Sequence, residues 1–242
     1  FEWYLKAAEQ GIASAQHSVG TMYAEAKVVE RDKEKAVSWL SKAEGPLRRQ
    51  HSYYAHQELM WLYAKGWAGA EEQQRAIDWY ANDCDRTIGQ FCLGRIYARG
   101  LGVRKDLQKA WAHYRKAADR DHSSAIYELG SMYFHGLGVN RDRLKSVALY
   151  QKAATPQSQF RLGRIYARGL GVEKNLKKAA AWYLHAAESN IAEAQFELGN
   201  LYAAGSGVER DGEKAAEWYR KAAAEGYVPA RRKLGMNAGP TP

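Results

Sequence analysis

Apolar residues recur along this chain with the spacing of an amphipathic helix. Near its end, five small or aromatic residues fall at positions i, i+3, i+4, i+7 and i+8, namely Ala215, Trp218, Tyr219, Ala222 and Ala223. This spacing places all five on one face of a helix, with charged residues opposite. Similar stripes recur upstream, so the sequence predicts a series of helices that each bury one face.

A second apolar pattern precedes each of these helices. Leu93, Gly94, Ile96 and Tyr97 occupy one broad arc when residues advance by about 100° each. Glycine inside a helix costs about 0.5–1 kcal/mol relative to alanine. We therefore interpret Gly94 as a place where a neighbouring helix approaches closely.

Turn-forming residues separate the two patterns. Gly100 is a typical C-terminal signal for the first helix of a pair. Short polar side chains precede the second helix, and the predicted N-caps are Asp32, Asp106, Asp142, Asn175 and Asp211. Pro46 is expected to stop a helix. The unit is thus two short helices joined by a turn.

The helical pair is an internal repeat. Residues 93–103 and 162–172 are identical, and the same template recurs at 129–139 and 198–208, with two weaker copies nearer the start. All insertions and deletions lie between repeats and none within them. Because one pair cannot bury both of its apolar faces, successive pairs are predicted to stack, which gives a solenoid.

We therefore predict an all-α chain that forms a single solenoid over residues 1–242. Full repeats are expected at 14–43, 54–84, 88–118, 124–154, 157–187 and 193–226, with partial repeats at 1–11 and 229–236 and a tail at 237–242. The first eight residues match the second-helix pattern of 216–223. Because the sequence also starts at Phe1 and not at Met, we expect a fragment or a mature product whose preceding first helix has been removed.

The composite pattern is Ala-x-Phe-x-Leu-Gly-x-x-Tyr-x-x-Gly-x-Gly-Val-x-x-Asp-x-x-Lys-Ala-x-x-Trp-Tyr-x-Lys-Ala-Ala. It resembles that of the Sel-one-like repeat (SLR) family, relatives of tetratricopeptide repeats, over essentially the whole chain. The resemblance implies a right-handed α/α superhelical solenoid of about six repeats, with the first helices lining the concave face. It also implies a binding or adaptor role in a bacterial, often exported, protein. The first two repeats depart from the pattern, with Ala26 and Val28 at loop-glycine positions and Met60 at the template glycine.

Composition excludes several classes of protein. The chain has 46% hydrophobic residues and a net charge of +9, from 36 Lys and Arg against 27 Asp and Glu. This balance argues against wholesale disorder. No apolar run approaches the roughly 20 residues of a membrane span. Two cysteines are too few for a disulfide scaffold or a four-thiolate zinc site.

No catalytic or metal-binding motif is found in the sequence. It lacks His-Glu-x-x-His, the phosphate-binding P-loop and Gly-x-Ser-x-Gly. The Gly-x-Gly pairs follow helices, not strands, so they are interpreted as turns. The seven histidines show no helical ligand spacing. We therefore predict a non-enzymatic protein with no cofactor, no metal and no small-molecule substrate.

The two cysteines leave a disulfide open. Cys84 occupies a position that is alanine in other repeats and is expected to be buried, whereas Cys92 is expected to be more exposed. Some SLR proteins form a disulfide between a helix end and the first helix of the next repeat. In this sequence the partner of Cys84 would then lie near position 90, whose side chain points almost opposite to that of Cys92. Catalysis by either thiol is disfavoured, because no helix terminus or cationic triad is implied nearby.

One arc of each first helix is not used for packing between repeats, and the SLR resemblance places it in the concave groove. Its aromatic residues lie beside cations, and arginine and aromatic residues are enriched in protein-binding hot spots. We call the following residues the first-helix surface: Trp61, Lys65, Trp67, Phe91, Arg95, Arg99, Tyr127, His135, Phe160, Arg164, Arg168 and Phe196. Two alternatives stay open. The aromatic residues could pack only between neighbouring repeats, and the arginines could form an ordinary solvated face.

Most of the tryptophans hold a template position of the second helix. Those predicted to lie in the core are Trp3, Trp39, Trp79, Trp182 and Trp218. Trp61 and Trp67 break the template. They are either anchors for a partner or the result of irregular packing around Met60.

These observations favour a solenoid whose groove binds an acidic or mixed-charge protein segment or domain. Nucleic-acid binding is the weaker alternative, because acidic residues are interleaved and no base-reading pair recurs along the repeats. The SLR resemblance implies a sharper hypothesis, an immunity protein that occludes a type VI-secreted phospholipase effector. An envelope scaffold or signalling regulator is the rival. A periplasmic location is implied by the resemblance alone, and the sequence is also compatible with the cytosol.

Overall fold

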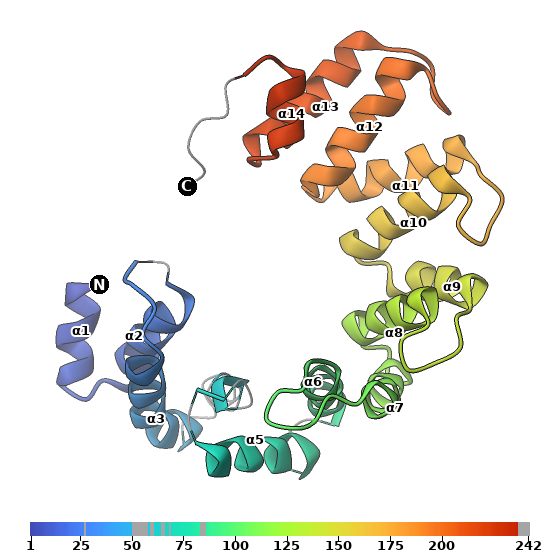
Figure 1. Cartoon of the computed structure of the whole chain (residues 1–242). Coiled ribbons are helices and arrows are strands. Elements are labelled where there is room, and N and C mark those ends of the chain that lie inside the picture. Colours follow the sequence, from blue (N-terminus) through green and yellow to red (C-terminus); the bar gives the residue numbers. More distant parts are fainter. Residues whose placement is uncertain are drawn as a thin grey trace. The chain divides into compact units, whose positions relative to one another are not determined.

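The structure is a computed structural model that describes residues 1–26, 28–49, 58, 61–63, 66–67, 69–82 and 86–236. Regular structure in this described part is α-helical, without a β-strand, which confirms the predicted all-α class (Figure 1). The helices are α1 Glu2–Glu9, α2 Ala13–Glu25, α3 Lys33–Arg49, α5 Ala70–Asn82, α6 Arg86–Arg99, α7 Leu107–Ala118, α8 Ser123–His135, α9 Arg143–Ala153, α10 Pro156–Arg168, α11 Leu176–Glu188, α12 Ala192–Ala204, α13 Gly212–Ala224 and α14 Val228–Lys233.

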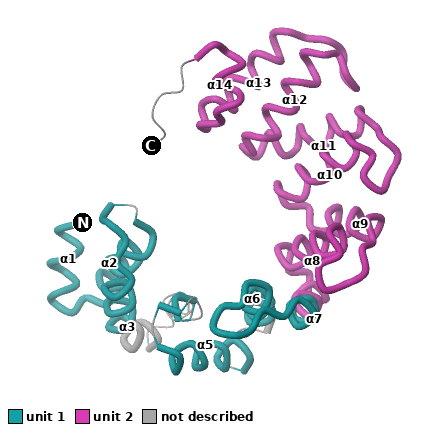
Figure 2. The backbone as a smooth tube through the Cα atoms, in the orientation of Figure 1, with its two compact units in different colours: residues 1–113 teal, residues 114–242 magenta. Residues whose placement is uncertain are grey.

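The chain divides into two compact units, residues 1–113 (unit 1) and 114–242 (unit 2), with the division inside α7 (Figure 2). In unit 1, α2 packs against α1 and α3, and α5 packs against α6. In unit 2, three helix pairs follow one another: α8 with α9, α10 with α11, and α12 with α13. Neighbouring pairs meet where α9 contacts α10 and α11 contacts α12. Unit 2 is therefore a row of stacked helical pairs. The single solenoid over residues 1–242, with its repeat boundaries, stays a prediction.

The second helices begin at the predicted N-caps. Each cap side chain accepts a hydrogen bond of 2.8–2.9 Å from the backbone N–H three residues later. These bonds satisfy amides that have no partner inside the helix. The five caps are Asp32, Asp106, Asp142, Asn175 and Asp211.

The residue that donates to each cap is a lysine, and its side chain makes a second contact. The ammonium of Lys145 lies 4.3 Å from the ring centroid of Tyr133, which belongs to the first helix of the same pair. Such cation–π contacts contribute about 0.5–1 kcal/mol at exposed sites. The same lysine–tyrosine pair occurs at 35 with 23, 109 with 97, 178 with 166, and 214 with 202. Cap and lysine together fix the turn between the two helices.

The template glycines allow the second helix to approach the first. A Cβ at Gly130 would lie 2.9 Å from the ring of Tyr150, and a Cβ at Gly199 would lie 2.7 Å from the ring of Tyr219. Real Cβ atoms essentially never come so close. Gly130 and Gly199 are therefore close-approach positions, the role that the sequence predicts for the equivalent Gly94.

The loop after α12 also contacts the preceding pair. Gly207, in the loop after α12, has φ +76°, a left-handed conformation that favours glycine. A Cβ at this position would collide with the backbone of Leu176 at the start of α11. The loop of one pair is thus seated on the second helix of the pair before it.

The apolar stripe predicted for the last second helix is confirmed, because Ala215, Tyr219, Ala222 and Ala223 are buried. Trp218 on the same helix is half-buried and packs against the cluster formed by α11 and α12. The tryptophan therefore covers the preceding helical pair.

Trp3 is the exception among the predicted core tryptophans. Trp79 is buried, and Trp39 and Trp182 are half-buried against the preceding core, but the Trp3 side chain is 83% exposed. The core prediction for Trp3 is wrong, because no helix among the described residues covers its ring.

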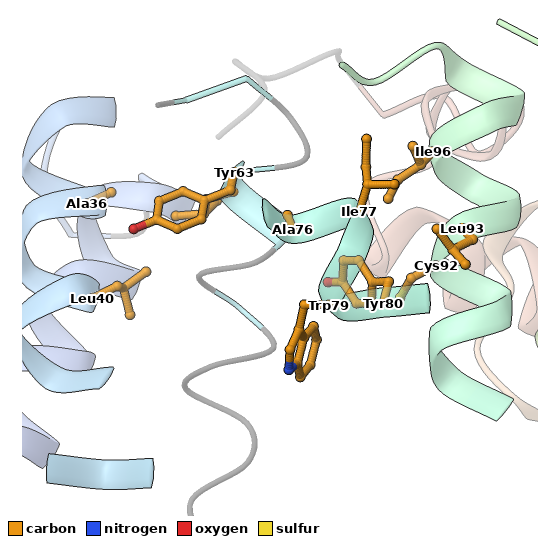
Figure 3. Close-up of a cluster of buried hydrophobic side chains, with 11 residues drawn as sticks. Ala36, Leu40, Tyr63, Ala76, Ile77, Trp79, Tyr80, Cys92, Leu93 and Ile96 are labelled. Carbon is orange, nitrogen blue, oxygen red and sulfur yellow. The ribbon is translucent and has the colours of Figure 1, made fainter. Parts of the chain in front are cut away.

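Two further expectations were wrong. Cys92 is only 6% exposed, because its small side chain joins a buried cluster with Trp79, Tyr80 and Leu93 (Figure 3). A thiol behaves there as a small apolar group. Pro46 does not stop a helix, since α3 continues to Arg49. Proline removes one helical hydrogen bond, and a helix can continue past that loss. Cys84 lies outside the described residues, so the structure does not test whether it pairs with Cys92.

Candidate protein-binding surface

The first-helix surface is displayed by helices that the template glycines hold against their partners. Phe91, Arg95 and Arg99 follow one another at four-residue spacing on α6, and residues four apart share a helix face. Tyr127 and His135 lie on α8. The remaining described members on helices α10 and α12 are Phe160, Arg164, Arg168 and Phe196. Lys65 lies outside the described residues.

In unit 1, Arg95 brings two aromatic residues of this surface together. Its guanidinium carbon lies 4.1 Å from the ring centroid of Trp61 and 5.7 Å from that of Phe91. Trp61 also packs against the buried cluster that contains Tyr80 and Leu93. Trp61 is therefore part of the core packing on one side and forms a cation–π pair on the other.

Trp67 has a similar double role in the loop that follows. Its ring packs against the same buried cluster. The Lys33 ammonium lies 5.8 Å from its ring centroid. Irregular packing thus accounts for part of the Trp67 surface, and the rest of this half-buried side chain borders solvent.

In unit 2, the aromatic residues of the surface pack partly inward. The ring centroid of Tyr127 lies 5.5 Å from that of Tyr150, and Phe160 lies 5.9 Å from Tyr183. Phe196 makes the equivalent contact with Tyr219 at 5.6 Å. All three first-helix rings are half-buried. Packing within the helical pair therefore explains part of the burial of each ring, and Phe196 also meets the ring of Tyr227 at 5.4 Å.

The arginines of unit 2 lie beside these rings. The Arg164 guanidinium is 5.8 Å from the ring centroid of Phe160, which repeats the Arg95–Phe91 pair of unit 1. Arg168, one turn further along α10, is exposed. Cation–π contacts of this kind hold an arginine head group in place while leaving its N–H donors free to bind.

Sequence reasoning missed a third arginine on the same helix. Arg161 is half-buried and its Nε donates a hydrogen bond of 3.3 Å to the Tyr127 hydroxyl. This bond is the main reason why the pKa of Arg161 is raised. Other repeats have serine, cysteine or glutamate at this template position. The sequence signal that could have identified Arg161 is therefore that the charge at this template position differs between repeats.

His135, Arg161 and Arg164 meet at a cavity in unit 2. Its volume is about 90 Å³. Burial raises the pKa of the Tyr150 hydroxyl in its wall to about 12, so this group is neutral near pH 7. The lining residues are Phe134, His135, Tyr150, Arg161, Arg164, Ile165 and Leu170.

Unit 1 contains a second cavity, of about 230 Å³, whose charge differs. Glu25 and Glu58 lie in its wall beside Trp61. Glu58 is also 2.9 Å from the Nε2 atom of His17. The expectation of a basic groove therefore does not describe this part of the chain, because the first two repeats contribute the acidic side chains Glu25 and Glu58.

Other kinds of site receive no support from the described residues. Within the described ranges, no three His, Cys, Asp or Glu side chains gather where they could hold a metal ion. No described helix combines the length and apolar character that a membrane span requires. The described residues instead form a surface of arginines, aromatic rings and small cavities.

Many solved structures resemble the chain, and three of them illustrate the likeness. The c5321 protective antigen of uropathogenic Escherichia coli, which displays an SLR fold, is 33% identical with a TM-score of 0.64, and the match covers 96% of this chain and 50% of c5321. This chain thus spans about half the length of c5321. A Sel1 repeat protein from Oxalobacter formigenes is 29% identical with a TM-score of 0.60, over 92% of this chain and 77% of that one. The immunity protein Pa5087 from Pseudomonas aeruginosa is 22% identical with a TM-score of 0.56, over 90% and 83%, and shares the fold.

No curated protein matches the chain at a significant level. The Sel1 repeat model, by contrast, matches residues 1–12, 13–44, 88–122, 123–155, 156–191 and 192–227. These matches leave out residues 45–87, where Met60 replaces the template glycine. Since the matched segments make up most of the sequence and its structural relatives display the SLR fold, the chain belongs to the Sel1 repeat family.

Proposed function

We propose that this chain is a non-enzymatic solenoid that binds an acidic or mixed-charge protein through the first-helix surface. Sel1 repeats typically bind proteins. The observation that carries the proposal is the arginine–aromatic pair that recurs in both units, Arg95 with Phe91 at 5.7 Å and Arg164 with Phe160 at 5.8 Å. Such pairs combine a flat apolar face with a guanidinium that recognises carboxylates, which are the properties of binding hot spots.

The family resemblance supports a more specific proposal. We propose an immunity protein that neutralises a type VI-secreted phospholipase effector by covering it, in the periplasm. The support is the SLR resemblance together with a net charge of +9. The immunity protein Pa5087 shares the fold. An envelope scaffold or signalling regulator is the alternative from the same family.

Affinity capture followed by mass spectrometry tests both levels of the proposal. The full chain is immobilised and exposed to lysate of its own source organism. Recovery of a phospholipase encoded beside the chain, and loss of its lipase activity on mixing, is the expected result for the immunity role. Recovery of structural or signalling proteins supports the alternative. If only nucleic acid is retained, with a steep loss at higher salt, protein binding is the wrong function.

A further inference from the structure

The cavities of the two units occupy the same place in the repeat. Each lies between the end of one first helix, the second helix that follows, and the start of the next first helix. His135, Tyr150 and Arg161 in unit 2 hold the template positions of Glu25, Leu40 and Glu58 in unit 1. The cavity is therefore a recurrent feature of the fold, and the side chains around it differ from repeat to repeat.

The charge of this recurrent cavity reverses between the units. The residue before the template leucine is Arg161 in unit 2 and Glu58 in unit 1. The last residue of the preceding first helix is His135 in unit 2 and Glu25 in unit 1. The two cavities share their place in the repeat but differ in volume, at about 90 and 230 Å³, and these substitutions set the charge that lines each one.

At the next equivalent place in unit 2, the polar side chains already form hydrogen bonds with one another. There the side-chain amide of Asn200 donates a hydrogen bond of 3.3 Å to Glu197, and the Tyr219 hydroxyl donates one of 2.9 Å to Asn200. Neither Arg161 nor Arg164, by contrast, has a carboxylate within ion-pair distance among residues 86–236. The basic cavity thus has cationic donors to offer to a partner.

The size of the basic cavity limits what it can receive. At about 90 Å³ it is smaller than the roughly 300–1,000 Å³ of typical small-molecule pockets, but larger than the roughly 10–15 Å³ that one water molecule needs. Phe134, Ile165 and Leu170 form an apolar part of its wall. A single side chain with a short aliphatic stem and a carboxylate fits these dimensions and this lining.

We propose that this cavity between α8, α9 and α10 receives an aspartate or glutamate side chain of the bound protein. Arg164 and Arg161 supply the N–H donors, which suit the two oxygens of a carboxylate. His135 adds a donor at the rim. The inference rests on the proposed function, because it names the chemistry that the first-helix surface recognises in its protein partner.

Selection from a displayed library of random short peptides on the full chain tests this inference. The wild-type chain is expected to enrich peptides with Asp or Glu at one fixed position. Arg164→Glu should weaken the binding of those peptides by at least about tenfold and should instead enrich peptides with Lys or Arg at that position. Arg164→Lys should retain the acidic preference with weaker binding, because lysine keeps the charge but loses the paired donors.

Arg210→Glu is the matched control. Arg210 is exposed in a loop of unit 2, and its replacement makes the same change in net charge. The acidic preference should survive this change. The inference is overturned if the wild-type chain selects no acidic position, if Arg164→Glu leaves the preference unchanged, or if Arg210→Glu abolishes it equally. If the captured protein partner binds the Arg164→Glu variant normally, the cavity inference fails while protein binding stands.

Discussion

The ring of Tyr219 occupies the space that any side chain at position 199 would need. A Cβ at Gly199 would lie 2.7 Å from this ring and 3.2 Å from the carbonyl oxygen of Ala215. The close approach of α12 and α13 depends on the absence of a side chain at position 199. Gly130 with Tyr150 and Gly163 with Tyr183 repeat the relationship.

Gly199→Ala should therefore destabilise the chain, although alanine is the better helix former. Forcing a methyl group against a buried ring costs about 1–3 kcal/mol. Gly212→Ala is the control, because its Cβ would meet no atom within 4 Å, and it should stabilise by about 0.4–1 kcal/mol. Urea denaturation measures both. Equal effects of the two substitutions would refute the packing argument.

Replacement of the two equivalent tryptophans should have unequal effects. Trp218→Ala removes a half-buried ring that covers the preceding pair, at a cost of about 1–3 kcal/mol, below the ~3–5 kcal/mol of a fully buried aromatic residue. Trp3→Ala removes an exposed ring and should change stability by less than about 0.5 kcal/mol. Thermal and urea denaturation are the measurements, and a large loss for Trp3→Ala would contradict its exposed position.

The N-cap Asp211 should make stability depend on pH at the acidic end. The N–H of Lys214, followed by the side chain of that lysine, lowers the pKa of the Asp211 carboxyl. A lowered folded-state pKa adds stability above the unfolded value of about 3.9, and this stability is lost as the pH falls through the folded pKa. Asp211→Asn keeps a capping oxygen without the charge.

The free energy of unfolding of the wild type should thus exceed that of Asp211→Asn at pH 7 and approach it as the pH falls below about 4. Asp211→Ala should be less stable than both at pH 7, because it loses the cap itself. A constant difference between wild type and Asp211→Asn across this range would mean that the charge of Asp211 adds nothing.

Tyr150 should make stability depend on pH at the alkaline end. Burial raises the pKa of its hydroxyl from 10.0 to about 12. Since the unfolded chain releases this proton first, the stabilisation is complete below pH 10 and is lost as the pH rises toward 12. The difference in unfolding free energy between wild type and Tyr150→Phe should fall over this interval. A difference that stays flat would show that the hydroxyl ionises freely in the folded chain.

Reversing the arginines of the first-helix surface should abolish partner binding. The variant replaces Arg95, Arg99, Arg164 and Arg168 with glutamate, and affinity for the captured partner should fall at least about tenfold. Helical content, measured by circular dichroism, should not change. The control replaces with glutamate the four exposed cations that directly precede the N-caps of second helices, namely Lys105, Arg141, Lys174 and Arg210. Equal losses in both variants would point to net charge rather than to this surface.

Short-range sequence patterns predicted the helices and their ends well. The N-caps, the apolar stripe of α13 and the role of the template glycines depend on residues a few positions apart or on one repeated contact. Such features repeat with the template, so one copy predicts the others.

Features that depend on neighbouring repeats were harder to predict. The exposure of Trp3 and the burial of Cys92 follow from which helical pair lies alongside, and the template alone does not give that. The basic cavity was missed for the same reason, because Arg161 and His135 belong to different repeats and come together only when α8 and α10 pack around Tyr150.

The seating of the Gly207 loop on Leu176 has a consequence for how unit 2 loses its order on heating. The main contacts of each pair are with the adjoining pairs, so the stability of the row is set by the contacts between neighbours. Unfolding then begins at a terminal pair of the row and proceeds from one pair to the next. A bulky residue at position 207 would weaken the contact between two adjoining pairs. The segments on either side of that contact would then melt separately, and the melting curve would show two steps.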